Sequence, residues 1–109
     1  MSLNLNINTI TLSGEVFRRD DKYTKNGSMY VSILLKQEIV DYDENNLICS
    51  RTNQMYKCHV FGSRAKSAIS IKEGDRLVVT GSLDTVRKDS NTFYMITVTQ
   101  FENHGKRPE

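Results

Sequence analysis

The sequence contains no tryptophan, a single proline and only two cysteines among its 109 residues. With so little proline and an ordinary glycine content, the composition is neither fibrous nor disordered. Cys49 and Cys58 are nine positions apart and have only His59 and His104 near them in sequence, which is not the spacing of zinc ligands. In a non-secreted chain such cysteines are expected to be reduced. We therefore expect no metal and no disulfide.

Long apolar segments are absent as well. No run approaches the roughly 20 apolar residues of a membrane span, and residues 1–20 lack the basic start, apolar stretch and cleavage site of a secretory signal. We therefore expect a cytoplasmic protein without a membrane partner. Apolar residues make up 38% of the chain, which suffices for the core of one domain.

The charge is unevenly distributed along the chain. The net charge is +2, but residues 38–53 carry four carboxylates against Arg51, so this segment has a charge of −3 and the remainder +5. A mildly basic remainder is compatible with a polyanionic partner, although most domains with such a charge bind none.

The clearest structural pattern lies in residues 56–83. Tyr56, Cys58 and Val60 alternate as in a half-buried strand, and after Gly62 the apolar period changes to that of a helix of about two turns. The apolar residues of this helix are Ala65, Ala68, Ile69 and Ile71. Ser63 is predicted to cap the helix, with Lys72 in its last turn and Gly74 as its stop. A further strand follows.

The strand after the helix is predicted over residues 76–83 and the other strands over residues 8–18, 28–36 and 93–101, with bends at Gly14 and Gly81. Residues 38–53 read as a long loop or a protruding hairpin whose arms are Glu38 to Tyr42 and Leu47 to Arg51. A lone helix between the third and fourth strands is the order of a five-stranded oligonucleotide-binding (OB) barrel. We predict an all-β fold with one short helix, with the barrel in residues 1–102 and a flexible tail in residues 103–109.

Two segments suit a single strand of nucleic acid, because cations meet phosphates while a ring stacks on a base. Arg18 to Gly27, predicted as a loop, places Tyr23 among Arg18, Arg19, Lys22 and Lys25. Asp20 and Asp21 leave open a merely solvated turn. The third strand presents Met55, Lys57, His59 and Phe61 opposite its core face. The alternative is an exposed face with Phe61 covered by a loop, and no sequence neighbour makes His59 catalytic.

Weaker candidates lie elsewhere. Arg87 and Lys88, at the base of a polar hairpin, resemble a second phosphate clamp, although basic residues are common at hairpin tips. In the acidic segment only Tyr42 and Arg51 are candidates. The predicted DNA contacts are Arg18, Arg19, Lys22, Tyr23, Lys36, Tyr42, Met55, Lys57, Phe61, Arg87 and Lys88. No catalytic residue is predicted, because the carboxylates are not clustered as a nuclease's metal site requires.

Four segments in register, NTITLSGEV, YKCHVFG, KEGDRLVVTGSL and FYMITVTQF, resemble the bacterial single-stranded DNA-binding (SSB) protein family over about residues 7 to 101. The runs LSGEVFR and SAISIKEGDRLVVTG also resemble primosomal replication protein N, a shorter dimeric relative. The resemblance implies an OB barrel that forms dimers or tetramers. It further implies sequence-independent binding of single-stranded DNA in replication, recombination and repair, without cofactor or catalysis.

The resemblance also implies roles for single positions. Met55 and Lys57 stand where the family has an aromatic and a basic DNA contact, Phe61 matches its stacking phenylalanine, and Lys88 falls where a stacking tryptophan is usual. The chain departs from the family in having no tryptophan, an acidic long loop, and no acidic tail ending in an aromatic residue. The alternative is a primosomal adaptor that bridges a helicase and DNA, which a dimeric state would favour.

Overall fold

The computed structural model describes residues 7–108, which form five strands and one short helix. The elements are β1 (Ile10–Tyr23), β2 (Met29–Tyr42), β3 (Ile48–Val60), α1 (Ser63–Ala68), β4 (Asp75–Lys88) and β5 (Asn91–Lys106). They close into a barrel in the order β1-β2-β3-β5-β4. β3 and β5 pair in parallel and the other neighbours are antiparallel. The predicted five-stranded OB barrel with one helix is confirmed.

The core is built from one face of each strand, as the alternation predicts. Val31, Ile33 and Leu35 of β2 are completely or almost completely buried, and so are Cys58 and Val60 of β3. The remaining core residues are Val16, Leu77, Val79, Ile96, Val98 and, from the helix and the turn after it, Ala65, Ala68 and Ile71. Burial raises the pKa of the Cys58 thiol to about 12, so this cysteine serves as a small apolar core residue.

Two glycines let strands approach more closely than a side chain would allow. A Cβ on Gly81 would overlap the carbonyl oxygen of Thr97, and the register of β4 against β5 shifts between Thr80 and Gly81. The predicted bend at Gly81 is confirmed. At Gly14 a Cβ would lie 2.7 Å from the carbonyl oxygen of Lys36, but the bulge in β1 lies between Val16 and Arg18, so Phe17 is its extra residue.

The segment predicted as a loop over Arg18 to Gly27 is mostly strand. Residues 18–23 continue β1 and pair with β2 as far as Tyr23 opposite Met29, so only a turn around Thr24–Ser28 remains. The alternation of apolar and polar residues did not indicate this part of β1, because it is rich in charged residues. It extends beyond the barrel and has no apolar face to bury.

The helix is shorter than predicted and is capped differently. It begins after Gly62, whose φ of 69° suits glycine, and no side chain caps it, so the prediction of Ser63 as N-cap is wrong. Its last turn contains Lys66, and not Lys72. Lys72 and Gly74 lie in the following turn, where the Asp75 carboxylate accepts a hydrogen bond from the Lys72 N–H at 2.9 Å. The described residues include no helix long and apolar enough to cross a membrane.

The last strand also extends beyond its predicted end at Phe101. β5 reaches Lys106, so residues 103–106, which the sequence placed in a flexible tail, belong to the sheet. Asn103 donates a hydrogen bond to the Asp75 carboxylate at 3.0 Å, and Arg76 donates to the carbonyl oxygens of His104 and Gly105. The pattern of apolar residues could not indicate these polar contacts, so it did not predict the end of β5.

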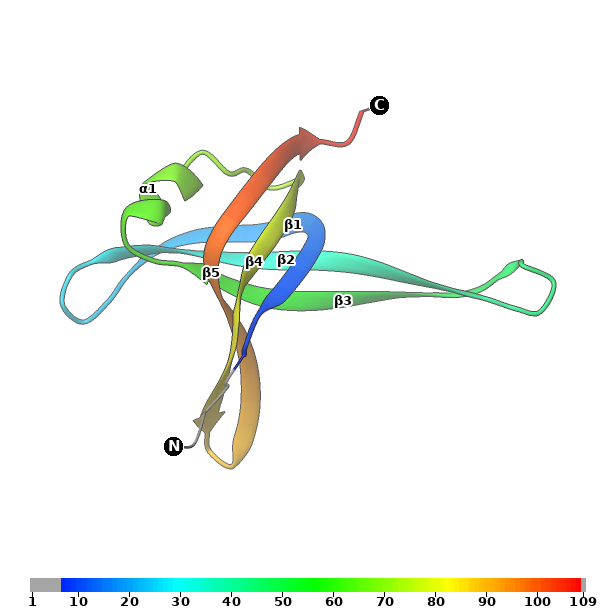
Figure 1. Ribbon diagram of the computed structural model, residues 1–109, viewed down its shortest axis with the longest axis horizontal. Helices are drawn as coiled ribbons and strands as arrows, with labels where there is room; N and C mark the ends of the chain where they lie inside the picture. Colours follow the sequence, from blue (N-terminus) through cyan, green and yellow to red (C-terminus); the bar gives the residue numbers. More distant parts are fainter. Residues whose placement is uncertain (1–6, 109) are drawn as a thin grey trace, which may run out of the picture.

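Three hairpins project from the barrel as arms (Figure 1). The β1–β2 arm turns at residues 24–28 and the β2–β3 arm at residues 43–47. The β4–β5 arm turns at Asp89 and Ser90, both with positive φ, as tight hairpins require. The β2–β3 arm is the protruding hairpin predicted over residues 38–53. In Figure 1 the β1–β2 and β2–β3 arms extend in opposite directions, and the β4–β5 arm extends away from both.

Candidate nucleic-acid interface

The sheet register gathers one set of side chains on the outer face of β1, β2 and β3. Beyond the Phe17 bulge, Leu34 lies between Arg18 and Lys57, and Ser32 lies between Asp20 and His59. Directly opposed residues of antiparallel strands share a face. We call this surface the outer face; it comprises Arg18, Asp20, Lys22, Tyr30, Ser32, Leu34, Lys36, Met55, Lys57, His59 and Phe61. The predicted set on the third strand, Met55, Lys57, His59 and Phe61, therefore shares the outer face with Arg18 and Lys22 of the predicted basic segment.

Three rings on this surface form an aromatic cluster. Tyr30 stacks on Phe61 with their centroids 5.1 Å apart and their planes at 29°. The His59 ring lies 5.0 Å from Tyr30 and 5.7 Å from Phe61. Phe61 is 37% exposed, so the cluster presents part of an apolar ring to solvent while its partners hold that ring in place.

His59 is the buried member of the cluster. Its residue is 9% exposed, and its Nε2 atom is buried without a hydrogen-bond partner. Burial, followed by the charges of Lys57 and Lys22, lowers the pKa of His59 from 6.5 to about 4. The imidazole is therefore neutral at pH 7. In the free protein His59 contributes to the site by packing against the rings of Tyr30 and Phe61.

A pocket of about 240 Å³, which we call the basic pocket, lies on the same surface. It is lined by Arg18, Asp20, Lys22, Ser32, Leu34 and Lys57. The Arg18 guanidinium is paired with Asp20 at 3.0 Å. Within residues 7–108, neither Lys22 nor Lys57 forms an ion pair. Two ammonium groups are therefore available to an anion in this pocket.

A second hollow runs between β3 and the β4–β5 arm. Its lining comprises Met55, Tyr56, Lys57, Leu83, Thr92, Phe93, Tyr94 and Ile96. Phe93 and Tyr94 are 54% and 64% exposed, respectively. Lys57 lines both hollows, so they adjoin at this side chain and together lead from the basic pocket to the β4–β5 arm. We call this hollow the arm groove.

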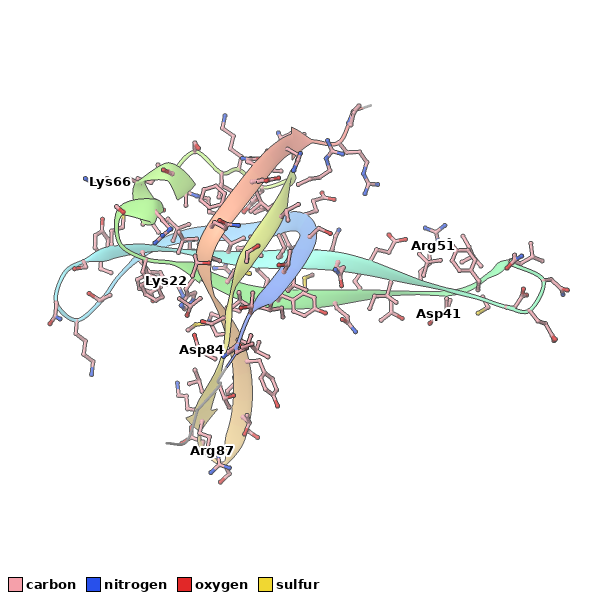
Figure 2. The ribbon with its side chains drawn as sticks, viewed as in Figure 1. Lys22, Asp41, Arg51, Lys66, Asp84 and Arg87 are labelled. Carbon is pink, nitrogen blue, oxygen red and sulfur yellow. The ribbon has the colours of Figure 1, made fainter. Side chains whose placement is uncertain are left out.

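The predicted basic pair lies near the tip of the β4–β5 arm, where Arg87 and Lys88 both line one hollow. Arg87 is opposite Thr92, which lines the arm groove, whereas Lys88 is opposite Asn91. Figure 2 shows Arg87 near the tip of this arm and Lys22 on the β1–β2 arm. Neither Arg87 nor Lys88 forms an ion pair among the described residues.

Other predicted contacts lie apart from this path. Arg19 faces the opposite side of β1, where its guanidinium donates to the Ala68 carbonyl oxygen at 3.4 Å and to Asp21 at 2.8 Å. Tyr23 is exposed at the end of the β1–β2 arm, and Tyr42 near the tip of the β2–β3 arm. On that arm Arg51 is paired with Glu38 at 2.9 Å (Figure 2).

Lys36 belongs to the outer face but lies at its margin. It is opposite Met55 on one side and Glu15 on the other. It also lines a separate cleft that contains Arg76 and Arg107. The nearby Glu15 carboxylate therefore offsets part of the attraction that the Lys36 ammonium group exerts on an anion.

The structure adds exposed or clustered aromatic residues that were not among the predicted contacts, namely Tyr30, Phe93 and Tyr94. Tyr30 lies on the outer side of the two-faced second strand, and only the β2–β3 register brings it to Phe61. Tyr94 lies in the predicted fifth strand, and its position on the arm leaves it exposed in the arm groove.

Solved structures with a similar fold include two single-stranded DNA-binding proteins. The wild-type single-stranded DNA-binding protein from Thermus aquaticus superposes with a TM-score of 0.76 at 17% identity, over 93% of this chain and 52% of that one. An SSB from Plasmodium falciparum, solved with single-stranded DNA, superposes with a TM-score of 0.74 at 19% identity, over 97% of this chain and 100% of that one. This chain has the OB fold of single-stranded DNA-binding proteins.

The protein PriB from Ralstonia solanacearum shares the OB fold too, with a TM-score of 0.67 at 21% identity, over 91% of this chain and 99% of that one. This chain spans about half the length of the T. aquaticus protein. No protein-family model and no curated protein matches the sequence. Among residues 7–108, no group of His, Cys, Asp and Glu side chains is placed to hold a metal ion.

Proposed function

We propose that the protein binds single-stranded DNA without sequence preference, along the outer face and the arm groove. The observation that carries this proposal is the aromatic cluster of Tyr30, His59 and Phe61 beside Lys22 and Lys57, which form no ion pair with any residue that the structure describes. Every base has a flat face that can stack on a ring, and every nucleotide has a phosphate that an ammonium group can meet. Such a surface needs no hydrogen bonds to particular base edges.

The preference for a single strand follows from the same geometry. In a duplex the base faces are covered by stacking, so rings such as Phe61 and Tyr94 have nothing to contact. The P. falciparum neighbour, described in complex with single-stranded DNA, supports this choice. The role we propose is in replication, recombination and repair, without a catalytic step and without a cofactor.

A second candidate function is that of a primosomal adaptor, which would bridge DNA and a helicase as a dimer during replication restart. The near-complete mutual coverage with the R. solanacearum PriB structure supports it. Both candidates require single-strand binding. They are separated by the mass of the protein in solution and by a direct test of helicase binding, in which a dimer with helicase affinity favours the adaptor.

The proposed function is tested by fluorescence anisotropy with labelled oligo-dT and a duplex of equal length. We expect the logarithm of the affinity for oligo-dT to fall linearly with the logarithm of salt concentration, with a slope of about −0.7 for each phosphate contact. Lys57→Ala should make this slope shallower by about one contact. Lys66→Ala, on α1 (Figure 2), is the matched control and should leave the slope unchanged. Equal or tighter binding of the duplex would refute the proposal.

A further inference from the structure

The basic pocket on the outer face adjoins the buried histidine. His59 is opposite Ser32, which lines the pocket, and stands two positions from Lys57, which also lines it, on the same face of β3. The Tyr30 and Phe61 rings pack against the imidazole, with their centroids 5.0 Å and 5.7 Å from it. Among the described residues, the buried Nε2 of His59 has no hydrogen-bond partner, and the ammonium groups of Lys22 and Lys57 in the neighbouring pocket form no ion pair.

The groups that face His59 come from all three strands. β1 contributes Lys22, together with Asp20 and Arg18. β2 contributes the phenol of Tyr30, and β3 contributes Lys57. The single carboxylate, that of Asp20, is held by Arg18 at 3.0 Å. The surroundings of the imidazole in the free protein are therefore positively charged, which opposes its protonation.

We propose that this pocket is a phosphate subsite, and that a backbone phosphate of the bound strand, lying between Lys22 and Lys57, causes His59 to take up a proton from solvent. The phosphate brings one negative charge, which offsets the repulsion exerted by the two ammonium groups. At a separation of about 6 Å and an effective dielectric constant of about 20, one such charge favours a neighbouring imidazolium by about a hundredfold. The imidazolium then becomes the third cation of the subsite. This inference rests on the proposed function.

The shift is large enough to measure. The pKa of His59 is about 4 in the free protein, and a hundredfold effect raises it to about 6 in the complex. Between these two values the complex binds more protons than its free components. Linkage then requires the affinity for DNA to increase as pH falls, by up to about tenfold per pH unit.

The test is the affinity of the full chain for labelled oligo-dT between pH 4.5 and pH 8 at constant ionic strength. Thymine does not titrate in this range, so the DNA adds no proton of its own. We expect the wild-type affinity to increase as pH falls below about 6.5, and His59→Gln to remove most of this increase. His104→Gln is the matched control: His104, the other of the two histidines, pairs with Glu102 at the end of β5. It should retain the wild-type pH dependence.

Identical pH dependence in the wild type and His59→Gln would overturn the inference while leaving the proposed function intact. Failure of the wild type to bind oligo-dT at any pH would overturn both. If His59→Gln does not fold, NMR of the histidine ring resonances in the wild-type protein measures the titration of His59 directly, with and without oligo-dT. The His59 resonance should titrate near pH 4 alone and about two pH units higher with oligo-dT; an unchanged midpoint in the complex would overturn the inference.

Discussion

Phe61 is the ring on which the proposed base stacking depends most directly. It is partly exposed, lies on the outer face, and is held by Tyr30 and His59. Phe61→Ala should weaken binding of oligo-dT by about 1 to 3 kcal/mol, the cost of a lost base stack. The fold should survive, because Phe61 lies outside the barrel core.

Anisotropy and a thermal melt of the same sample separate these two effects. Phe61→Leu is the matched variant, since it retains an apolar side chain but removes the flat ring, and it should weaken binding to a similar extent. If Phe61→Ala unfolds the protein while the surviving folded fraction binds with unchanged affinity, the residue is structural and not a stacking contact.

His59 should also make the stability of the free protein dependent on pH. Its pKa is about 4 when folded and near the ordinary 6.5 when unfolded, so the unfolded chain binds more protons between these values. The free energy of unfolding should therefore be retained above pH 6.5 and fall as pH decreases toward 4, by about 3 kcal/mol for this residue.

His59→Phe keeps a ring in the cluster and removes both the titration and the unsatisfied nitrogen. Chemical denaturation at pH 7.5 and pH 4.5 should show a smaller loss of stability in this variant than in the wild type. Equal losses would mean that His59 is protonated as readily in the folded protein as in the unfolded chain.

The β4–β5 arm is the element that extends the proposed binding path beyond the barrel. Tyr94 is exposed in the arm groove next to Lys57 and Met55. Tyr94→Ala should weaken binding of oligo-dT by about 1 to 3 kcal/mol, and the melting temperature should change little because the side chain is exposed. The measurement is anisotropy with oligo-dT long enough to pass both the outer face and the arm.

Val86→Ala is the matched control on the same arm. Val86 is exposed as well, but it is absent from the lining of the arm groove. Its removal should leave the affinity unchanged. Equal weakening by both variants would indicate that the arm is simply destabilised, whereas no weakening by Tyr94→Ala would exclude the arm groove from the binding path.

At the scale of the whole molecule we predict self-association. Within the closed barrel no strand of the described residues has a free edge, but apolar side chains on the surface and the edges of the two-stranded arms are uncovered in one copy. Phe17, at the bulge of β1, is 53% exposed, and the two-stranded arms offer further backbone edges. Sedimentation at micromolar concentration should give the mass of a dimer or tetramer.

Phe17→Glu should shift that mass toward the monomer, because a carboxylate in an apolar contact is costly to bury. A wild-type protein that sediments only as monomer would contradict the prediction. A mass that Phe17→Glu leaves unchanged would place the contact elsewhere on the surface.

Much of the fold was predictable from the sequence, because strand alternation has a period of two and separates faces without reference to other strands. It correctly placed Cys58 and Val60 in the core and Lys57 and Phe61 outside it. The order of the strands and of the single helix was sufficient to predict the barrel. Residues 18–23 form a charged part of β1 beyond the barrel and do not alternate between apolar and polar residues. The sequence pattern therefore did not predict the full length of β1.

The assembly of the candidate site was decided only by the tertiary structure. Tyr30 meets Phe61 through the register of β2 against β3, which alternation within one strand does not specify. The sequence alone could not separate the paired cations from the unpaired ones: Arg18 and Arg19 have carboxylates within reach, whereas Lys22 and Lys57 have none among the described residues. Stacking and ion pairing act over a few ångströms between different strands, so they depend on distances that exist only once the barrel has closed.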